Sequence, residues 1–413
     1  MAPSDWHRLA LIWYDAGMKQ AMIVLMGCVV GALLMGADEP TEGVSRGYSI
    51  PQVDLAGQSH RQVVVDREEG QYLGHPTTVL MGNGKTIWCV YPRGHGRGAI
   101  VLKRSDDGGL SWSERLDTPT SWATSLETPT VYRVRDTVAE EDGGAVGGER
   151  LILFSGLYPV RMASSNDLGA TWSELEAIGS YGGIVANASL AQRRDGTLVS
   201  WFHDDGRFIV EGGRDGARDA GVPDGFVVYQ IESRDSGRTW SKTSVVVARE
   251  DVDLCEPGLV VSPDGNEWAL LLRENSRTRN SFVVFSKDEG ASWSEPRELP
   301  GSLTGDRHTA VYAPDGRLFI SFRDTAHETA TKGDWVGWIG SWDDIVGGRE
   351  GAYRVRLEDN HHWWDCAYPG VLALDDGTIV TTTYGHWSEG ESPWILSVRF
   401  TLDELDAMVE ELP

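Results

Sequence analysis

The chain has 413 residues, of which 40% are apolar, so it can bury a large core but is too long for one simple sandwich. Its 62 acidic residues outnumber 37 basic ones and give a formal charge of −25, a field that repels nucleic acid and anionic membrane surfaces. A nucleic-acid-binding role is therefore disfavoured, and an anionic substrate would need a local cluster of arginines.

The first feature along the chain is an apolar run from Ala21 to Ala37, preceded by Lys19 and followed by an acidic, turn-forming stretch. A basic start, a short apolar centre and small residues at the end are typical of a secretory signal peptide. At 17 residues the run is short for a membrane span, and a retained anchor is the alternative. We interpret residues 1–37 as a signal peptide or N-terminal anchor and residues 38–413 as one exported domain with no other membrane role.

The cysteines indicate neither a disulfide framework nor a metal site. Cys28 lies inside the apolar run and weakly resembles a lipoprotein acylation site. The other three, Cys89, Cys255 and Cys366, cannot pair into a framework, and their spacing matches no zinc motif. No EF-hand pattern is present either. We therefore predict no metal and no other cofactor.

A motif of the form Ser-x-Asp-x-Gly-x-(Ser/Thr)-Trp organises the chain from residue 105 onward. It occurs four times, at Ser105–Trp112, Ser165–Trp172, Ser233–Trp240 and Ser286–Trp293. Asp and Ser side chains bond nearby backbone N–H groups in tight turns, Gly supplies positive φ, and the Trp can pack a hairpin onto its neighbour. The motif is thus predicted to stabilise the fold, and its aspartates are not catalytic candidates.

A second repeated element is a Gly-centred hairpin turn that leads into an apolar strand, as in the sequences that begin at Gly82, Arg194, Pro263, Pro314 and Asp375. Together with the Ser/Asp/Gly/Trp motif, it defines a four-stranded unit of propeller-blade size. Six such units fall near residues 72–115, 125–176, 183–243, 254–297, 306–347 and 365–402. The predicted fold is all-β, a six-bladed β-propeller, in which residues 38–70 complete the sixth blade and Leu402 to Leu412 form a terminal helix.

The repeated motif resembles the Asp-box of the sialidase (neuraminidase) family, and the resemblance covers nearly all of the chain after residue 70. It implies an exo-glycosidase that removes a terminal acidic sugar, sialic acid first, from a glycan or glycoconjugate with retention of configuration. In that family a Tyr activated by a Glu attacks the anomeric carbon, an Asp is the acid/base, and three Arg bind the substrate carboxylate.

Two segments carry the resemblance at the site. Glu256-Pro257 followed by a hairpin that ends in Arg273 resembles the family's Glu-Pro segment, which implies that Glu256 is the base and Arg273 a carboxylate ligand. Tyr368-Pro369 resembles the family's Tyr-Pro segment, which makes Tyr368 the candidate nucleophile. A surface ion pair of Glu256 with Arg273, and a Tyr368 that only packs on the proline, are the structural alternatives.

The first blade departs from the family pattern. An Arg-Ile-Pro signature is expected where His75-Pro76 stands, and no carboxylate lies where the acid/base Asp is expected. An imidazole has a pKa suited to proton transfer near neutrality, so His95 or His75 is a candidate for the acid role, and Arg93 for the missing carboxylate ligand. Asp365, close to Tyr368 in sequence, is a further catalytic candidate.

The sequence offers two candidates for the third arginine and a second candidate region for the acid. Arg307 and Arg323 stand at opposite ends of one hairpin and both fit the third arginine, with His308 beside the first as a further substrate-binding candidate. Asp205, in the His-Asp-Asp-Gly sequence of the third blade, is another candidate, although Asp-Asp-Gly is also an ordinary turn. The rival hypotheses are a carbohydrate-binding propeller without turnover and an exo-hydrolase of a different sugar with a His-based acid.

Overall fold

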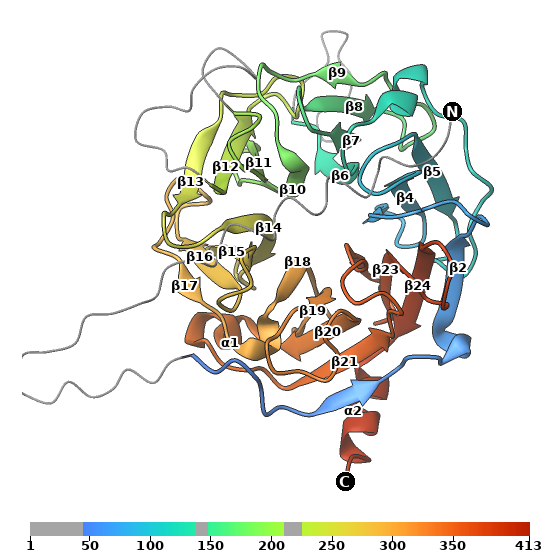
Figure 1. Cartoon of the computed structure of the whole chain (residues 1–413). Helices are drawn as coiled ribbons and strands as arrows, with labels where there is room; N and C mark the ends of the chain where they lie inside the picture. Colours follow the sequence, from blue (N-terminus) through green and yellow to red (C-terminus); the bar gives the residue numbers. More distant parts are fainter. Residues whose placement is uncertain (1–43, 138–147, 210–224) are drawn as a thin grey trace, which may run out of the picture. The chain divides into compact units, whose positions relative to one another are not determined.

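The computed structural model describes residues 44–137, 148–209 and 225–413 (Figure 1). The predicted signal peptide lies outside these described residues. Val44–Pro413 form one compact unit. Within the part of the chain that the structure describes, no helix has the length and apolar character needed to cross a membrane.

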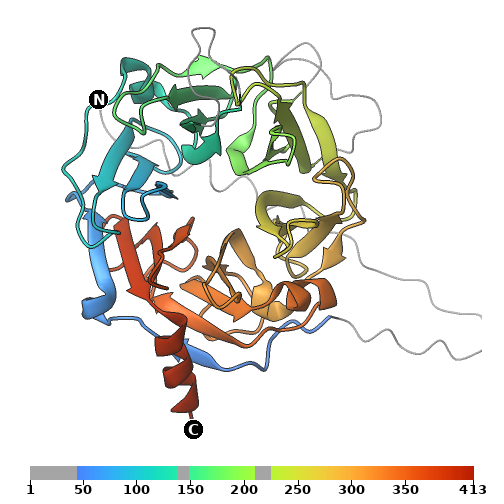
Figure 2. The ribbon, with the colours of Figure 1, turned by 180° about the vertical axis from the view of Figure 1, so that it is seen from behind.

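Six β-sheets stand around a common centre, as both faces of the ring show (Figures 1 and 2). The blades in chain order are β3 (Thr77–Leu80), β4 (Ile87–Pro92) and β5 (Ile100–Ser105); β6 (Thr130–Arg135), β7 (Glu149–Ser155), β8 (Arg161–Ser165) and β9 (Glu176–Ala177); β10 (Ile184–Gln192), β11 (Leu198–Asp204), β12 (Val227–Ser233) and β13 (Ser244–Ala248); β14 (Leu254–Val261), β15 (Trp268–Glu274), β16 (Phe282–Ser286) and β17 (Arg297–Glu298); β18 (Gly305–Tyr312), β19 (Leu318–Asp324), β20 (Trp335–Gly340) and β21 (Tyr353–Glu358); and β22 (Gly370–Ala373), β23 (Ile379–Gly385) and β24 (Trp394–Phe400). The first strand of each blade contacts the first strands of its neighbours, so these six strands line the centre. The prediction of a six-bladed β-propeller is confirmed.

The N-terminal part of the described chain closes the ring. Strand β2 (Gln62–Asp66) pairs antiparallel with β24 and is the outermost strand of the sixth blade, as predicted. Strand β1 (Gln52–Asp54) pairs parallel with β21 and adds a fifth strand to the fifth blade, which the sequence did not indicate. Joining the two ends of the chain in this way removes the open edge that an unclosed ring of sheets would expose.

Each Ser/Asp/Gly/Trp motif forms the turn after the third strand of its blade. In the second blade Ser165 Oγ accepts a hydrogen bond from Gly169 N at 2.8 Å, Asp167 Oδ1 accepts one from Thr171 N at 2.9 Å, and Gly169 has a φ of 91°. The other three copies repeat these contacts. Trp240 packs edge-on against Phe154 of the preceding blade, with ring centroids 5.4 Å apart. The hydrogen bonds of the boxes therefore stabilise the turns, and the tryptophan packs one blade against the next, as predicted.

Two helices follow local capping signals. Where the fifth blade lacks a box, Ser341 caps α1 (Trp342–Gly347) in a capping box with Asp344. Thr401 and Glu404 make the same reciprocal pair at the start of α2 (Leu402–Glu410), the predicted terminal helix. Short 3-10 turns occur at Ser59–Arg61, Thr120–Thr124 and Gly301–Leu303.

The innermost strands begin with strained backbone that positions the site. The register of β14 on β15 shifts between Cys255 and Gly258, so Glu256 lies in a β-bulge. The backbone angle φ is 50° at Glu256, 55° at His75 and 55° at Ala367, values that residues other than glycine rarely adopt. Such strain persists only where the surroundings impose it, and it clusters at functional sites. In a regular strand the side chains alternate between the two faces of the sheet. The bulges interrupt this alternation and turn side chains toward the centre of the ring.

Candidate active site

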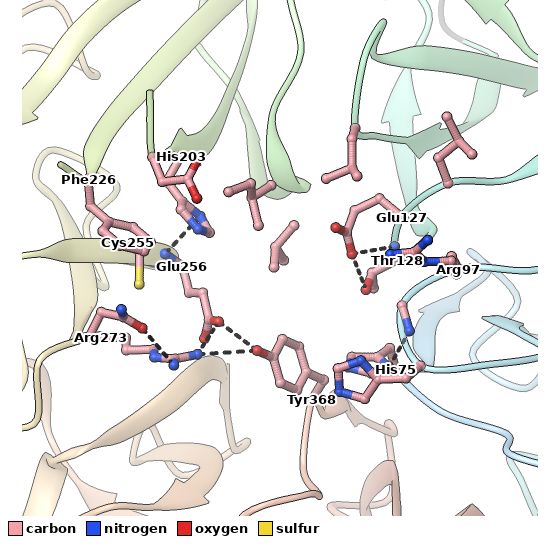
Figure 3. A pocket seen from close by; sticks show the side chains of 18 of the residues that line it. His75, Arg97, Glu127, Thr128, His203, Phe226, Cys255, Glu256, Arg273 and Tyr368 are labelled. Carbon is pink, nitrogen blue, oxygen red and sulfur yellow. Dashed lines mark hydrogen bonds and ion pairs between the residues drawn. The ribbon is translucent and has the colours of Figure 1, made fainter. Parts of the chain in front are cut away.

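Two cavities meet at the centre of the ring. The first, of about 330 Å³, is lined mainly by polar side chains that include Glu127, His203 and Asp205 (Figure 3), and we call it the polar lobe. The second, of about 570 Å³, is lined by Trp363 and Trp364 among others, and we call it the aromatic lobe. Four residues line both lobes: His75, His95, Arg273 and Tyr368. The junction of the lobes is therefore where several blades present reactive side chains together.

Tyr368, Glu256 and Arg273 lie together at this junction (Figure 3). The Tyr368 hydroxyl donates a hydrogen bond to Glu256 Oε1 at 2.6 Å. Arg273 Nη1 donates to the same carboxylate oxygen at 2.6 Å and lies 3.5 Å from the Tyr368 hydroxyl. Glu256 is 3% exposed and Tyr368 9% exposed, so the surface ion pair considered as the structural alternative does not describe Glu256 and Arg273.

Three blade elements bring these groups together although 112 residues separate the tyrosine from the glutamate. Glu256 is in the bulge of β14, and Arg273 is on β15, opposite Cys255. Tyr368 lies two residues before β22 and follows Ala367, whose φ is 55°. The fourth and sixth blades thus present a base and a phenol at the same end of their innermost strands.

The protonation states follow from burial and charge. Burial and the charge of Glu256 raise the pKa of Tyr368 well above its ordinary value, so the phenol is neutral until a base removes its proton. Burial alone would raise the pKa of Glu256, but the positive charge of Arg273 outweighs it and the net shift is downward. Glu256 is therefore an ionised acceptor for the Tyr368 proton.

A buried carboxylate that the sequence did not single out joins three arginines. Asp306 is fully buried and accepts hydrogen bonds from Arg277 Nη2 at 2.7 Å and Arg323 Nε at 2.9 Å. Arg273 Nε lies 3.3 Å from its other oxygen. Burial opposes ionisation of Asp306, but the charges of Arg273, Arg323 and Arg277 hold its pKa well below the ordinary value. Asp306 is thus an ionised counter-ion that fixes the arginine cluster.

His95 and Asp365, the two remaining catalytic candidates, also lie together. His95 Nε2 is 3.6 Å from Asp365 Oδ1, and the His95 side chain is 57% exposed toward the cavities. Asp365 is buried and accepts hydrogen bonds from Tyr72 at 2.8 Å and Tyr384 at 3.1 Å, while His386 Nε2 lies 3.2 Å from its second oxygen. The aspartate is therefore held in place, and the exposed imidazole beside it is free to meet a ligand.

His75 is placed differently from His95. Its Nδ1 lies 3.3 Å from the backbone N of Gly96, and its Nε2 lies 3.1 Å from the Tyr384 hydroxyl. Burial, followed by the positive charges of His95 and Arg323, lowers the pKa of His75 well below its ordinary value. This histidine is neutral and its two nitrogens are occupied, so it lines the junction and supports its neighbours rather than supplying a proton.

Three of the predicted substrate-binding residues lie away from both lobes. Arg93 forms a half-exposed ion pair with Glu68 at 2.8 Å. Arg307 donates from Nη1 to the carbonyl of Ala188 at 2.7 Å, and His308 Nε2 lies 2.9 Å from the carbonyl of Leu303. Backbone carbonyls hold Arg307 and His308, which lie in the irregular part of β18, and an ion pair holds Arg93.

Arg323 and Asp205, two further substrate-binding candidates, line the cavities, as Arg273 does. Arg323 lines the aromatic lobe, where besides binding Asp306 it donates from Nη1 to the carbonyl of Cys366 at 3.2 Å. Asp205 lines the polar lobe and pairs with Arg207 at 2.7 Å.

Two groups of the polar lobe were not among the predicted site residues, although His203 belongs to the His-Asp-Asp-Gly sequence that contains Asp205. Glu127 stands on the wall opposite Glu256 and Arg273 (Figure 3), and burial raises its pKa. His203 is fully buried, its Nδ1 lies 3.4 Å from the backbone N of Glu256, and burial lowers its pKa to about 4. His203 occupies the place on the second strand of its blade that Arg273 occupies in the next blade. Aligning the internal repeats strand by strand is the signal that would have found it.

The described residues contain no cluster of three or more His, Cys, Asp or Glu side chains suited to a metal ion. Cys89, Cys255 and Cys366 are free and buried. Burial raises the pKa of each thiol, which disfavours a nucleophilic thiolate. The buried thiols are therefore not candidates for the nucleophile.

Comparison with known proteins identifies the family to which the chain belongs. Residues 51–381 match the family model of the BNR repeat-like domain, which spans most of the chain. The chain belongs to this family.

Solved structures show the same architecture. A protein of unknown function from Dyadobacter fermentans is similar, with a TM-score of 0.63 and 16% identity over 82% of this chain and 97% of that one. A mutant of the NanB sialidase from Streptococcus pneumoniae has a TM-score of 0.55 and 12% identity over 83% and 71% of the two chains. The leech intramolecular trans-sialidase has a TM-score of 0.55 and 15% identity over 82% and 69%. At these identities the likeness shows a fold shared with glycoside hydrolases, the sialidase-like six-bladed propeller.

Proposed function

We propose that the protein is a retaining exo-glycosidase of the sialidase type, in which Tyr368 is the nucleophile and Glu256 its base. The observation that carries the proposal is the 2.6 Å hydrogen bond from the Tyr368 hydroxyl to Glu256 in the wall of the cavity. A neutral phenol is a weak nucleophile and needs an adjacent base, and an ionised glutamate at this distance meets that need.

In the first step Tyr368 Oη forms a bond to the anomeric carbon while Glu256 accepts the phenol proton. The glycosidic C–O bond breaks, and His95, oriented by Asp365, gives a proton to the leaving oxygen. In the second step water gives a proton to His95 and attacks the anomeric carbon. The bond from the sugar to Tyr368 then breaks, and Glu256 returns its proton to the phenolate. The sum is hydrolysis with retained configuration.

The terminal sugar that this proposal favours is acidic, with sialic acid first. Within the ion-paired cluster at the junction, the guanidinium groups of Arg273, Arg277 and Arg323 outnumber the carboxylates of Asp306 and Glu256 by one positive charge. The carboxylate of Asp365 lies beside His95 and His386 instead. This local excess stands out in a chain with a formal charge of −25. A tyrosine nucleophile also avoids the repulsion that a carboxylate nucleophile would meet from an acidic sugar.

A second candidate is hydrolysis of a terminal sugar without a carboxylate by the same groups. The observation in its favour is that Asp306 already accepts hydrogen bonds from Arg277 and Arg323, while Arg273 donates to Glu256 and to Asn275. Few N–H groups of the cluster are then left for a substrate carboxylate.

The test is a kinetic comparison of aryl sialosides with neutral aryl glycosides for the purified protein, with Tyr368→Phe as the matched inactive variant. Turnover of the sialoside that is lost in Tyr368→Phe supports the first candidate. Turnover of neutral glycosides alone supports the second. Sugar binding without any turnover contradicts both and indicates a carbohydrate-binding propeller.

We further propose that the protein is exported, in secreted, periplasmic or surface-anchored form, on the basis of the apolar run Ala21–Ala37.

A further inference from the structure

Two tryptophans on the loop before Tyr368 are open to solvent. Trp363 is 77% exposed and Trp364 43% exposed, with ring centroids 5.9 Å apart, and both line the aromatic lobe. The other tryptophans within the described ranges are buried or half-buried. Large aromatic rings that are exposed beside a cavity with polar groups mark binding surfaces, because exposure of apolar surface to water is unfavourable and a ligand would cover it.

The loop that carries these rings is held rigidly against the fifth blade. Arg323 Nη1 donates hydrogen bonds to the carbonyls of Trp364 and Cys366, and the Cys366 thiol donates to the carbonyl of Gly333 at 3.0 Å. Gly333 has a φ of 93°, and a Cβ there would lie 2.1 Å from the carbonyl oxygen of Trp363. Only glycine permits this close approach. The tryptophan surface is therefore formed before any ligand binds.

The position of the acid decides which part of a glycoside meets this surface. The acid protonates the oxygen of the leaving group, so the leaving group must lie beside His95. The rings of His95 and Trp364 have centroids 6.4 Å apart. The attacked sugar lies at Tyr368 and Glu256, and the unit released from it then lies against Trp364 and Trp363. This step rests on the proposed function.

The charge of the aromatic lobe selects the chemistry of that unit. Lys332 lines the lobe, is exposed, and forms no ion pair with any residue that the structure describes. The Arg277 side chain, also in the lining, is 39% exposed. The one acidic residue of the lining, within the described part of the chain, is Asp324, which is buried and paired with Arg354 at 2.9 Å. Asp306 compensates the charge of Arg277, so the charge that the lobe presents without an ion-pair partner among the described residues is that of Lys332, beside the aromatic rings.

We propose that the aromatic lobe is a leaving-group subsite for a sugar unit that carries a negative charge, either a carboxylate or a sulfate. Trp363 and Trp364 pack against the apolar face of the sugar ring. Lys332 binds its anionic group by a charge-assisted hydrogen bond.

The experiment compares substrates that share one terminal sugar, the one that the wild-type protein hydrolyses. The leaving unit is fluoride, a neutral hexose, a uronic acid or a sulfated hexose. Fluoride is too small to reach the tryptophans, so a glycosyl fluoride reports on the reaction centre alone. The variants are Trp363→Ala, with Trp363→Phe as its conservative partner, and Lys332→Gln, with Lys287→Gln as the control at an exposed lysine outside the lobe.

We expect the wild-type protein to prefer an anionic leaving unit to the neutral hexose by at least tenfold in kcat/KM. Trp363→Ala should lower kcat/KM by about tenfold for all three sugar leaving units but by less than twofold for the fluoride, and Trp363→Phe should restore most of the loss. Lys332→Gln should abolish the preference for the anionic unit, while Lys287→Gln leaves it intact. Comparison of the uronic acid with the sulfated hexose identifies which anion is preferred.

Two results would overturn the inference. An equal loss for the fluoride and the disaccharides in Trp363→Ala assigns the tryptophan a purely structural role, and a wild-type protein indifferent to the charge of the leaving unit removes the anionic class. If no glycoside is hydrolysed, the proposed function fails, and calorimetric titration of free glucuronate and galactose 6-sulfate into wild-type and Trp363→Ala protein still tests the lobe. Absence of binding then contradicts the subsite itself.

Discussion

Replacement of Glu256 by glutamine tests the base directly, because the amide keeps the shape of the side chain but cannot take a proton. The Tyr368 hydroxyl, now 2.6 Å from Glu256 Oε1, can still donate to the amide oxygen. General-base catalysis contributes roughly 10²–10⁴-fold to a rate, so kcat should fall by about that factor, or about 3–5 kcal/mol in the barrier.

The same substitution has a structural cost that must be measured separately. Removing one partner of a buried ion pair costs roughly 3–5 kcal/mol. The lower end applies here, because Arg273 keeps Asn275 at 2.7 Å and Asp306 at 3.3 Å. Urea denaturation gives this loss, and kcat is measured on protein shown to be folded. The matched control is Glu298→Gln, which breaks an ion pair with Arg46 outside the cavities and should leave kcat unchanged. Folded Glu256→Gln protein with wild-type kcat would refute the assignment.

Four further outcomes are expected. Asp167→Ala removes the acceptor of three box hydrogen bonds and should lower the free energy of unfolding by about 1–2 kcal/mol at unchanged kcat; abolished turnover at an unchanged melting temperature contradicts a structural box. Burial lowers the pKa of His203 to about 4, so between about pH 6.5 and 4 the unfolded chain binds a proton that the native state does not bind. The free energy of unfolding should therefore fall as pH drops from about 6.5 toward 4. His203→Gln should flatten that slope, measured by urea denaturation at each pH. Arg273→Ala should raise KM for acidic substrates at least tenfold more than for neutral ones; an equal rise argues against carboxylate recognition. N-terminal sequencing of exported protein should begin after Ala37, unless the segment is kept as an anchor, and unprocessed protein confined to the cytoplasm is the contrary result.

The fold was predictable because each copy of its repeated motif forms a turn through contacts between residues that are close in sequence. Each box needs Ser, Asp, Gly and Trp at fixed spacing to close one turn, so four copies define four blades without any long-range information. The added strand β1 was not predictable, because three residues in parallel pairing leave no periodic signal.

The site was predictable only in part. Tyr368 and Glu256 are each followed by proline near the start of an innermost strand, and the resemblance of these segments to the Tyr-Pro and Glu-Pro segments of sialidases predicted both. Asp306 gave no such signal, because its importance comes from ion pairs with Arg273 and Arg277 of the neighbouring fourth blade and with Arg323 of its own blade. The choice between Arg307 and Arg323 likewise depended on a bulge in β18, whose register no single sequence discloses.

The central claim is that Tyr368 forms a covalent bond to the sugar, and trapping that intermediate tests it most directly. A glycosyl fluoride of the accepted terminal sugar, with a second fluorine next to the anomeric carbon, slows breakdown of the intermediate by destabilising positive charge at that carbon. Mass spectrometry of the inactivated, digested protein should find the fluorinated sugar on the peptide that contains Tyr368, and none in Tyr368→Phe. An adduct on another residue, or sustained turnover of substrate by the Tyr368→Phe variant, would contradict the account.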